Sequence, residues 1–257
     1  MASDADIYRQ AERGMTKQDI EIKTQDGMAN ARLFRPAAPA KAGVILYMDI
    51  FGLRPVLDQM AERLAERGYA VLVPDLFYRY APYGPFDPKT AFAEAKTKAL
   101  LLMLSGGTTQ GMTIRDGSAF LDALTAEGIS GPVGVVGYCM GGARALNTAA
   151  AYPGRIVAAA SFHGGNLASD APDSPHLKAS SIKARVYVGV AGVDGSFPPE
   201  QSARLAEALR VAEVDHTIEN YVGVGHGWCI KDHSVYDEAG AERHWKRLTT
   251  FFGETLG

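Results

Sequence analysis

The sequence contains few cysteines, no long apolar run and no large excess of one charge. Its 257 residues include only Cys139 and Cys229, which are too few for a disulfide framework and fit a reducing cytoplasm. No stretch reaches the roughly 20 apolar residues of a membrane span. The first residues have neither a basic segment nor an apolar core, so we expect no secretory signal and a cytoplasmic protein.

The formal net charge is −3, and acidic and basic residues are mixed along the chain. This pattern argues against a nucleic-acid-binding surface or a polybasic membrane anchor, so the expected partner is a small molecule. With 47% hydrophobic and 21% charged residues, residues 1–257 fit one large α/β domain with a substantial core.

An N-terminal extension and a hairpin are expected at about 1–40, because Asp26-Gly27 separates the strand patterns 19–24 and 28–34. From residue 44 onward, strand and helix patterns alternate. The expected strands are 44–48, 70–74, 133–136, 156–162, 185–190 and 214–221, and the expected helices are 55–67, 111–126, one after 142, 199–211 and 236–252. The alternation predicts a mostly parallel sheet of about eight strands with helices on both faces. Segments 78–89 and 163–183 follow strand ends and are candidate pocket walls or lids.

A cysteine stands where a strand must turn abruptly into a helix. Residues 137–142 read Gly-Tyr-Cys-Met-Gly-Gly and follow the apolar run 133–136. This pattern is typical of a nucleophile elbow, in which the flanking glycines allow a strained turn. The helix N-terminus behind Cys139 favours a thiolate over a thiol. A dinucleotide-binding turn is the alternative, but the glycine spacing differs and the next strand, 156–162, ends without an acid.

A base and an orienting acid follow in the expected chain order. His226 lies in a glycine-flanked loop after the last expected strand, and Asp194 lies between a strand and a helix that begins with proline. The order Cys139, Asp194, His226 is that of the α/β-hydrolases. His163, at the end of strand 156–162, is expected to line the site rather than to catalyse.

Four other residues have a spacing that loosely suggests metal ligands. They are His226, Cys229, Asp232 and His233. Because no second Cys/His pair completes a tetrahedral site, we expect neither a metal nor a cofactor.

On these motifs the chain resembles the dienelactone hydrolase family, cysteine-nucleophile members of the α/β-hydrolase fold. Segments 48–52, 74–79, 137–142 and 225–226 carry the resemblance, together with Asp194 and Pro198. It implies a single α/β-hydrolase domain that cleaves a lactone or activated ester, and an oxyanion hole formed by the N–H groups of Met140 and Ile50. It also implies a set of substrate-binding positions: Tyr78, Arg79, Phe51, His163, Trp228 and Ile230.

The chain departs from the family pattern at two of these positions. Asp49 stands where the family usually has a glutamate that helps to form the thiolate. Ile230 stands where a second substrate-binding arginine is expected, and Arg54 and Arg144 are candidates to compensate. Losing a guanidinium from a carboxylate clamp removes a contact worth about 1.5–3 kcal/mol, so a less acidic lactone or ester is an equally good substrate candidate.

Three alternatives remain open. Within the hydrolases, the chain fits a thioesterase or a general carboxylesterase. Outside them, it fits a non-catalytic small-molecule-binding protein of the same fold, or a redox sensor that uses Cys139 and Cys229.

Overall fold

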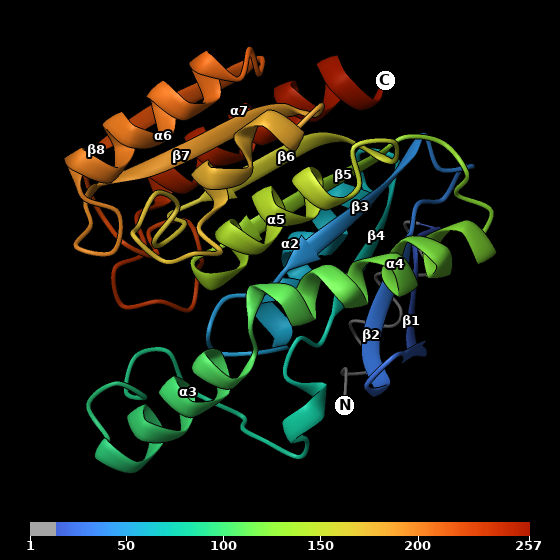
Figure 1. The fold of residues 1–257 in the computed structure, drawn as a ribbon. Helices are drawn as coiled ribbons and strands as arrows, with labels where there is room; N and C mark the ends of the chain where they lie inside the picture. Colours follow the sequence, from blue (N-terminus) through green and yellow to red (C-terminus); the bar gives the residue numbers. More distant parts are fainter. Residues whose placement is uncertain (1–13) are drawn as a thin grey trace.

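The computed structural model describes residues 14–257, which form one eight-stranded sheet with helices on both faces (Figure 1). The strands are β1 (Thr16–Thr24), β2 (Gly27–Arg35), β3 (Ala42–Tyr47), β4 (Tyr69–Pro74), β5 (Val133–Tyr138), β6 (Ile156–Phe162), β7 (Arg185–Val193) and β8 (His216–Gly225). Their spatial order is β1-β2-β4-β3-β5-β6-β7-β8, and all pairs from β4 to β8 are parallel. The predicted mostly parallel sheet is confirmed.

The first two strands form the antiparallel hairpin that the Asp-Gly signal predicts. Thr24 pairs with Gly27, so Gln25 and Asp26 make the turn, and Gly27 has a φ of +141°. Strand β2 then joins the parallel part of the sheet by pairing antiparallel with β4. Part of the expected N-terminal extension falls on residues 1–13 and lies outside the described residues.

The core lies around the central strands. Every residue of β3, β4 and β5 is buried, which explains why these strands appear in the sequence as continuous apolar runs. Helices α2 (Pro55–Ala65) and α7 (Glu238–Leu256) cover one face of the sheet. Helices α4 (Gln110–Ala126), α5 (Met140–Ala151) and α6 (Pro199–Val211) cover the other (Figure 1).

One helix is missing from the sequence prediction. Helix α3 (Ala95–Gly107) extends away from the body of the molecule in Figure 1. It buries Leu101 and Leu104 but exposes Leu102 and Met103. Its centre is an unbroken apolar run, so the sequence has no helical period to detect. The two candidate wall or lid segments, 78–89 and 163–183, each contain a short 3₁₀ helix, η1 (Tyr78–Tyr80) and η2 (Pro175–Ser181).

In the part of the chain that the structure describes, no helix combines the length and the apolar character needed to cross a membrane.

Candidate active site

The parallel strands bring the predicted site residues to one edge of the sheet. Their carboxyl ends meet there, and the segments that follow β3, β5, β6, β7 and β8 carry Asp49, Cys139, His163, Asp194 and His226. Ligands bind at this edge in open α/β sheets.

Cys139 occupies a strained turn between β5 and α5. Its φ of 53° and ψ of −117° lie in a region that L-residues rarely adopt. A Cβ at Gly137 would lie 1.9 Å from the carbonyl oxygen of Gly141, and a Cβ at Gly141 would lie 2.4 Å from that of Tyr47. Both positions therefore need glycine, and the predicted strand-to-helix turn at Cys139 is present.

Asp194 and His226 are in direct contact. Nδ1 of His226 lies 2.7 Å from Oδ2 of Asp194, whose carboxylate accepts the N–H. One ring nitrogen of His226 and the sulfur of Cys139 belong to a group whose ligand atoms lie within 4.8 Å of one another. Asp194, His226 and Cys139 therefore lie next to one another at this edge of the sheet.

The charges of this row stabilise one another. Burial lowers the pKa of His226, but the neighbouring Asp194 and Cys139 outweigh burial and raise it to about 10. Burial raises the pKa of Asp194, but His226 and Ser196 hold it below its ordinary value. At neutral pH the arrangement therefore favours an imidazolium beside an ionised Asp194.

Ser196 is a member of this group that the sequence reasoning missed. Its hydroxyl donates to Oδ1 of Asp194 at 2.6 Å and also lies 3.2 Å from Nδ1 of His226. Its backbone N–H donates to the same Oδ1 at 2.8 Å. The signal was present, because a serine two residues after an aspartate in Asp-Gly-Ser is typical of a turn in which the carboxylate accepts the backbone N–H.

The two predicted oxyanion donors lie on adjacent segments. Met140 is the first residue of α5, so its N–H has no partner within the helix. Ile50 follows β3, whose last residue pairs with Gly137 next to the elbow. Among residues 14–257, the Ile50 N–H donates no hydrogen bond.

Asp49 is fully buried and has partners of its own. Its carboxylate receives two bonds from Arg54, at 2.6 and 2.8 Å, one from the Phe51 N–H at 2.9 Å, and lies 3.1 Å from Nε2 of His233. Burial raises the pKa of Asp49, but Arg54 and His233 hold it well below its usual range. Arg54 also binds Asp232, so it does not extend toward Cys139 as a free guanidinium.

His163 lies beside the Asp194–His226 pair. Its ring packs edge-on against His226, with centroids 4.9 Å apart, and against Trp228 at 5.4 Å. It is 1% exposed and neither of its ring nitrogens has a hydrogen-bond partner among the described residues. Burial, together with His226 and His233, lowers its pKa well below the ordinary value, so the ring is neutral.

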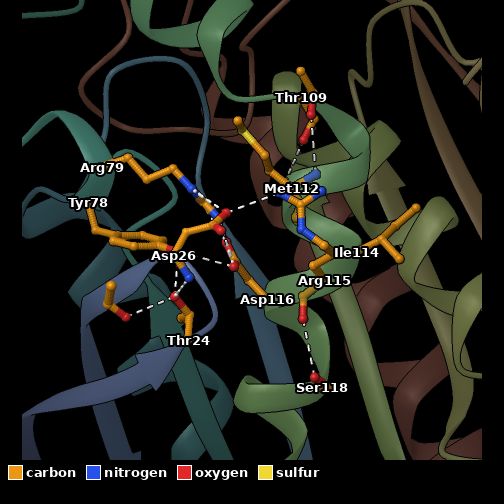
Figure 2. A network of polar contacts seen from close by, with 12 residues as sticks. Thr24, Asp26, Tyr78, Arg79, Thr109, Met112, Ile114, Arg115, Asp116 and Ser118 are labelled. Carbon is orange, nitrogen blue, oxygen red and sulfur yellow. Dashed lines mark hydrogen bonds and ion pairs between the residues drawn. The ribbon is translucent and has the colours of Figure 1, made fainter.

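Arg79 and Tyr78 belong to a separate polar network (Figure 2). Arg79 forms ion pairs with Asp26 in the β1–β2 turn and with Asp116 in α4, at 2.6 and 2.8 Å. The hydroxyl of Tyr78 donates to Asp116 and contacts Thr24. The charge of Arg79 is therefore neutralised by two carboxylates of the protein itself.

The remaining predicted substrate contacts are largely buried. Phe51 packs against Phe92 and His233, with centroids 5.6 and 5.3 Å apart, while Trp228 and Ile230 are completely buried. Arg144 is buried as well, and its guanidinium donates to the carbonyl oxygen of Thr108.

Among the described residues, the four residues whose spacing loosely suggests metal ligands, His226, Cys229, Asp232 and His233, form no ligand cluster. Asp232 and His233 bind Arg54 and Asp49, whereas Cys229 is buried and, like Cys139, a free thiol. Among the described residues, the structure brings together a different set, Cys139, His163 and His226.

The sheet order, the elbow and the row of acid, histidine and thiol define an α/β-hydrolase. The sequence profile of the dienelactone hydrolase family matches residues 29–256, and the chain belongs to that family. A carboxymethylenebutenolidase of Rhodococcus opacus is 29% identical over 219 residues, which cover 83% of this chain and 81% of the relative. Membership identifies the chain as a hydrolase of esters or lactones.

Two solved structures show the same fold. A dienelactone hydrolase-like promiscuous phosphotriesterase from metagenomic libraries superposes with a TM-score of 0.77 at 24% identity, covering 95% of this chain and 99% of its own. The dienelactone hydrolase from Anabaena variabilis does so with a TM-score of 0.65 at 18% identity, covering 95% and 100%.

Proposed function

We propose that this protein hydrolyses a lactone or an activated ester with Cys139 as nucleophile, His226 as base and Asp194 as the residue that orients the base. The observation that carries the proposal is the 2.7 Å contact between Asp194 and Nδ1 of His226, with Cys139 beside the same ring. Because Nδ1–H donates to Asp194, Nε2 is left to exchange a proton with the thiol.

The reaction follows from this geometry. In the reactive form His226 already holds the proton of the Cys139–His226 pair, and the Cys139 thiolate adds to the ester carbonyl carbon while the carbonyl electrons move to oxygen. The N–H groups of Ile50 and Met140 stabilise that oxyanion. Its collapse breaks the bond to the alcohol oxygen, which takes the proton from His226 and leaves an acyl-thioester. His226 then deprotonates a water molecule, which adds to the thioester and expels the thiolate.

The nucleophile also limits the substrates. A thiolate leaves a tetrahedral intermediate easily, so the alcohol must leave more easily still for the acyl-enzyme to form. Enol lactones and aryl esters meet this condition, and simple alkyl esters do not. Activated substrates are therefore favoured.

Asp49 is assigned a positioning role rather than that of a proton acceptor. Its two oxygens are occupied by Arg54, His233 and the Phe51 N–H. These contacts fix the segment that carries the Ile50 N–H. Asp49→Asn should therefore lower kcat but leave the alkylation rate of Cys139 by iodoacetamide nearly unchanged, whereas a proton acceptor would slow alkylation as well.

The substrate is proposed to carry no carboxylate near the scissile bond. The Rhodococcus opacus relative is named for a butenolide with a carboxymethylene group. In this chain Arg79 is paired with Asp26 and Asp116, and position 230 is an isoleucine. A neutral aryl ester should therefore be cleaved at least as efficiently as its counterpart with a terminal carboxylate. Arg79→Met should change kcat/KM for both esters by the same factor, and a selective loss for the acidic ester would contradict the assignment.

Kinetics with an aryl ester tests the proposed triad. Cys139→Ala should abolish turnover, and Asp194→Asn should lower kcat with little change in KM, because it misorients the base. Full activity of Cys139→Ala would refute the nucleophile. Relative kcat/KM values for enol lactones and acyl-thioesters separate a lactonase from a thioesterase. Rapid alkylation of Cys139 at about pH 6 separates an enzyme from a non-catalytic binding protein, whose buried thiol stays protonated.

A further inference from the structure

His163 is anomalous in this site because it is buried without a polar partner. Both of its ring nitrogens lack hydrogen bonds among the described residues, although the side chain is 1% exposed. Leaving a buried polar group unpaired costs about 1–3 kcal/mol. Its φ of +39° adds backbone strain, which persists only where the surrounding structure imposes it. An imidazole nitrogen without a hydrogen-bond partner is available to bind a metal ion.

The neighbours of His163 supply two further ligands. The sulfur of Cys139 and nitrogens of His163 and His226 all lie within 4.8 Å of one another. Tetrahedral zinc with bonds of about 2.0–2.3 Å places its ligand atoms roughly 3.3–3.6 Å apart, so side-chain shifts of about 1 Å close the site. One thiolate and two imidazoles are ligands that zinc prefers.

Asp194 is not a proposed ligand but orients one of the ligands, His226. It accepts the Nδ1–H of His226 at 2.7 Å, which turns Nε2 toward the thiol. Carboxylates hold metal-binding histidines in this way, fixing the tautomer and the ring orientation. Ser196 fixes the carboxylate in turn through its hydroxyl and its N–H. His226 is therefore oriented before any ion binds.

We propose that Cys139, His163 and His226 form a binding site for a divalent zinc-like ion, and that the bound ion reversibly blocks hydrolysis. The ion occupies the thiolate and Nε2 of His226, which the proposed reaction needs. On binding, the one proton shared by the Cys139–His226 pair leaves to solvent, and no oxidation or reduction takes place. A fourth coordination position remains for water, because three protein ligands converge among residues 14–257.

Cobalt titration of the chelator-stripped full chain tests binding without using activity. One equivalent of Co²⁺ should produce a thiolate-to-cobalt charge-transfer band, and Zn²⁺ should remove it by displacement. Cys139→Ala should lack the band while keeping the wild-type circular dichroism spectrum. A wild-type protein without the band, or a Cys139→Ala variant that retains it, would overturn the proposal.

Two histidine variants locate the site. His163→Ala should weaken Zn²⁺ binding, measured by calorimetry. Removing a residue that only hydrogen-bonds to a metal-binding histidine costs roughly 10- to 100-fold in affinity, so loss of His163 as a direct ligand should cost at least as much. His216→Ala is the matched control and should bind Zn²⁺ like wild type. His216 is the first residue of β8, and the site lies at the carboxyl ends of the strands. Equal affinity of the His163→Ala variant and wild type would exclude His163 as a ligand.

Inhibition of ester hydrolysis by the bound ion is measured in a separate experiment. Added Zn²⁺ should abolish aryl ester turnover in proportion to occupancy, and EDTA should restore it. Full turnover with the site saturated would refute the blocking step. Binding needs only the three side chains, so a protein that binds Co²⁺ but hydrolyses no ester would refute the proposed function and leave the metal site standing.

Discussion

Substitution by methionine should lower the free energy of unfolding strongly at one buried arginine, Arg54, and change it little or raise it at another, Arg144. Arg54 is 6% exposed and binds the fully buried Asp49 through two hydrogen bonds and Asp232 through two more. Arg144 is 5% exposed, but it forms no ion pair within 4 Å among residues 14–257, and its Nε and Nη1 have no hydrogen-bond partner there. Methionine is close in length to arginine and removes only the charged head.

The expected magnitudes follow from the partners left behind. In Arg54→Met, Asp49 keeps only His233 and the Phe51 N–H, and an uncompensated buried charge costs about 3–5 kcal/mol of unfolding free energy. In Arg144→Met, one bond to the Thr108 carbonyl is lost, worth about 1 kcal/mol, while a buried and unpaired charge is removed. Burial already lowers the pKa of Arg144 to about 10, consistent with an unfavourable environment for its charge.

Urea denaturation followed by circular dichroism measures both changes. We expect Arg54→Met to lose at least about 3 kcal/mol and Arg144→Met to stay within about 1 kcal/mol of wild type or to exceed it. Asp49→Asn combined with Arg54→Met should recover part of the loss, because no buried charge remains. Equal losses at the two arginines would refute the reasoning.

Three further predictions concern the elbow, the acid and the pH dependence of stability. Gly137→Ala should lower the free energy of unfolding, measured in urea, by about 3 kcal/mol or more, because its Cβ would lie 1.9 Å from a backbone oxygen. Gly131→Ala is the control, since its Cβ would meet nothing within 4 Å, and should stay within about 0.5 kcal/mol of wild type. Equal effects would contradict the strained turn. Ser196→Ala should lower kcat about fivefold, or roughly 1 kcal/mol, since the Asp194–His226 bond survives; a loss as large as that of Asp194→Asn would show that Ser196 does more than support the carboxylate. Burial lowers the pKa of His244 from 6.5 to about 3, so the unfolded chain takes up a proton first and stability falls as the pH drops below 6.5, by up to about 1.4 kcal/mol per unit. His163, whose pKa burial also lowers, contributes a slope of the same sign, so His244→Gln should reduce the slope in urea unfolding between about pH 5 and 6.5 by the His244 share, and an unchanged slope would contradict it.

The sequence predicts the parts of this protein that depend on local patterns. Buried strands appear as apolar runs, and the elbow and the chain order of Cys139, Asp194 and His226 depend on residues close to strand ends. Helix α3 escaped prediction because its apolar centre has no period. The sequence shows that positions 49 and 230 differ from the residues usual in the family. It does not show which contacts Asp49 and Arg79 make instead.

Those replacements are contacts between distant segments. Asp49 binds His233, which follows it by 184 positions, and Arg79 binds Asp116 on another helix. His163 likewise lacks a polar partner because His226 and Trp228, which follow β8, pack their rings against it. Pairings of this kind require the tertiary fold, so the polar surroundings of Cys139 become visible only in the structure.

Cys139 is proposed to become acylated during hydrolysis. The most direct test is rapid acid quenching of the enzyme with an activated aryl ester, followed by intact-mass and peptide mass spectrometry. We expect an increase equal to one acyl group, located on the peptide that contains Cys139 and absent from Cys139→Ala. Continued turnover by Cys139→Ala, with no adduct on that peptide in the wild type, would contradict the account.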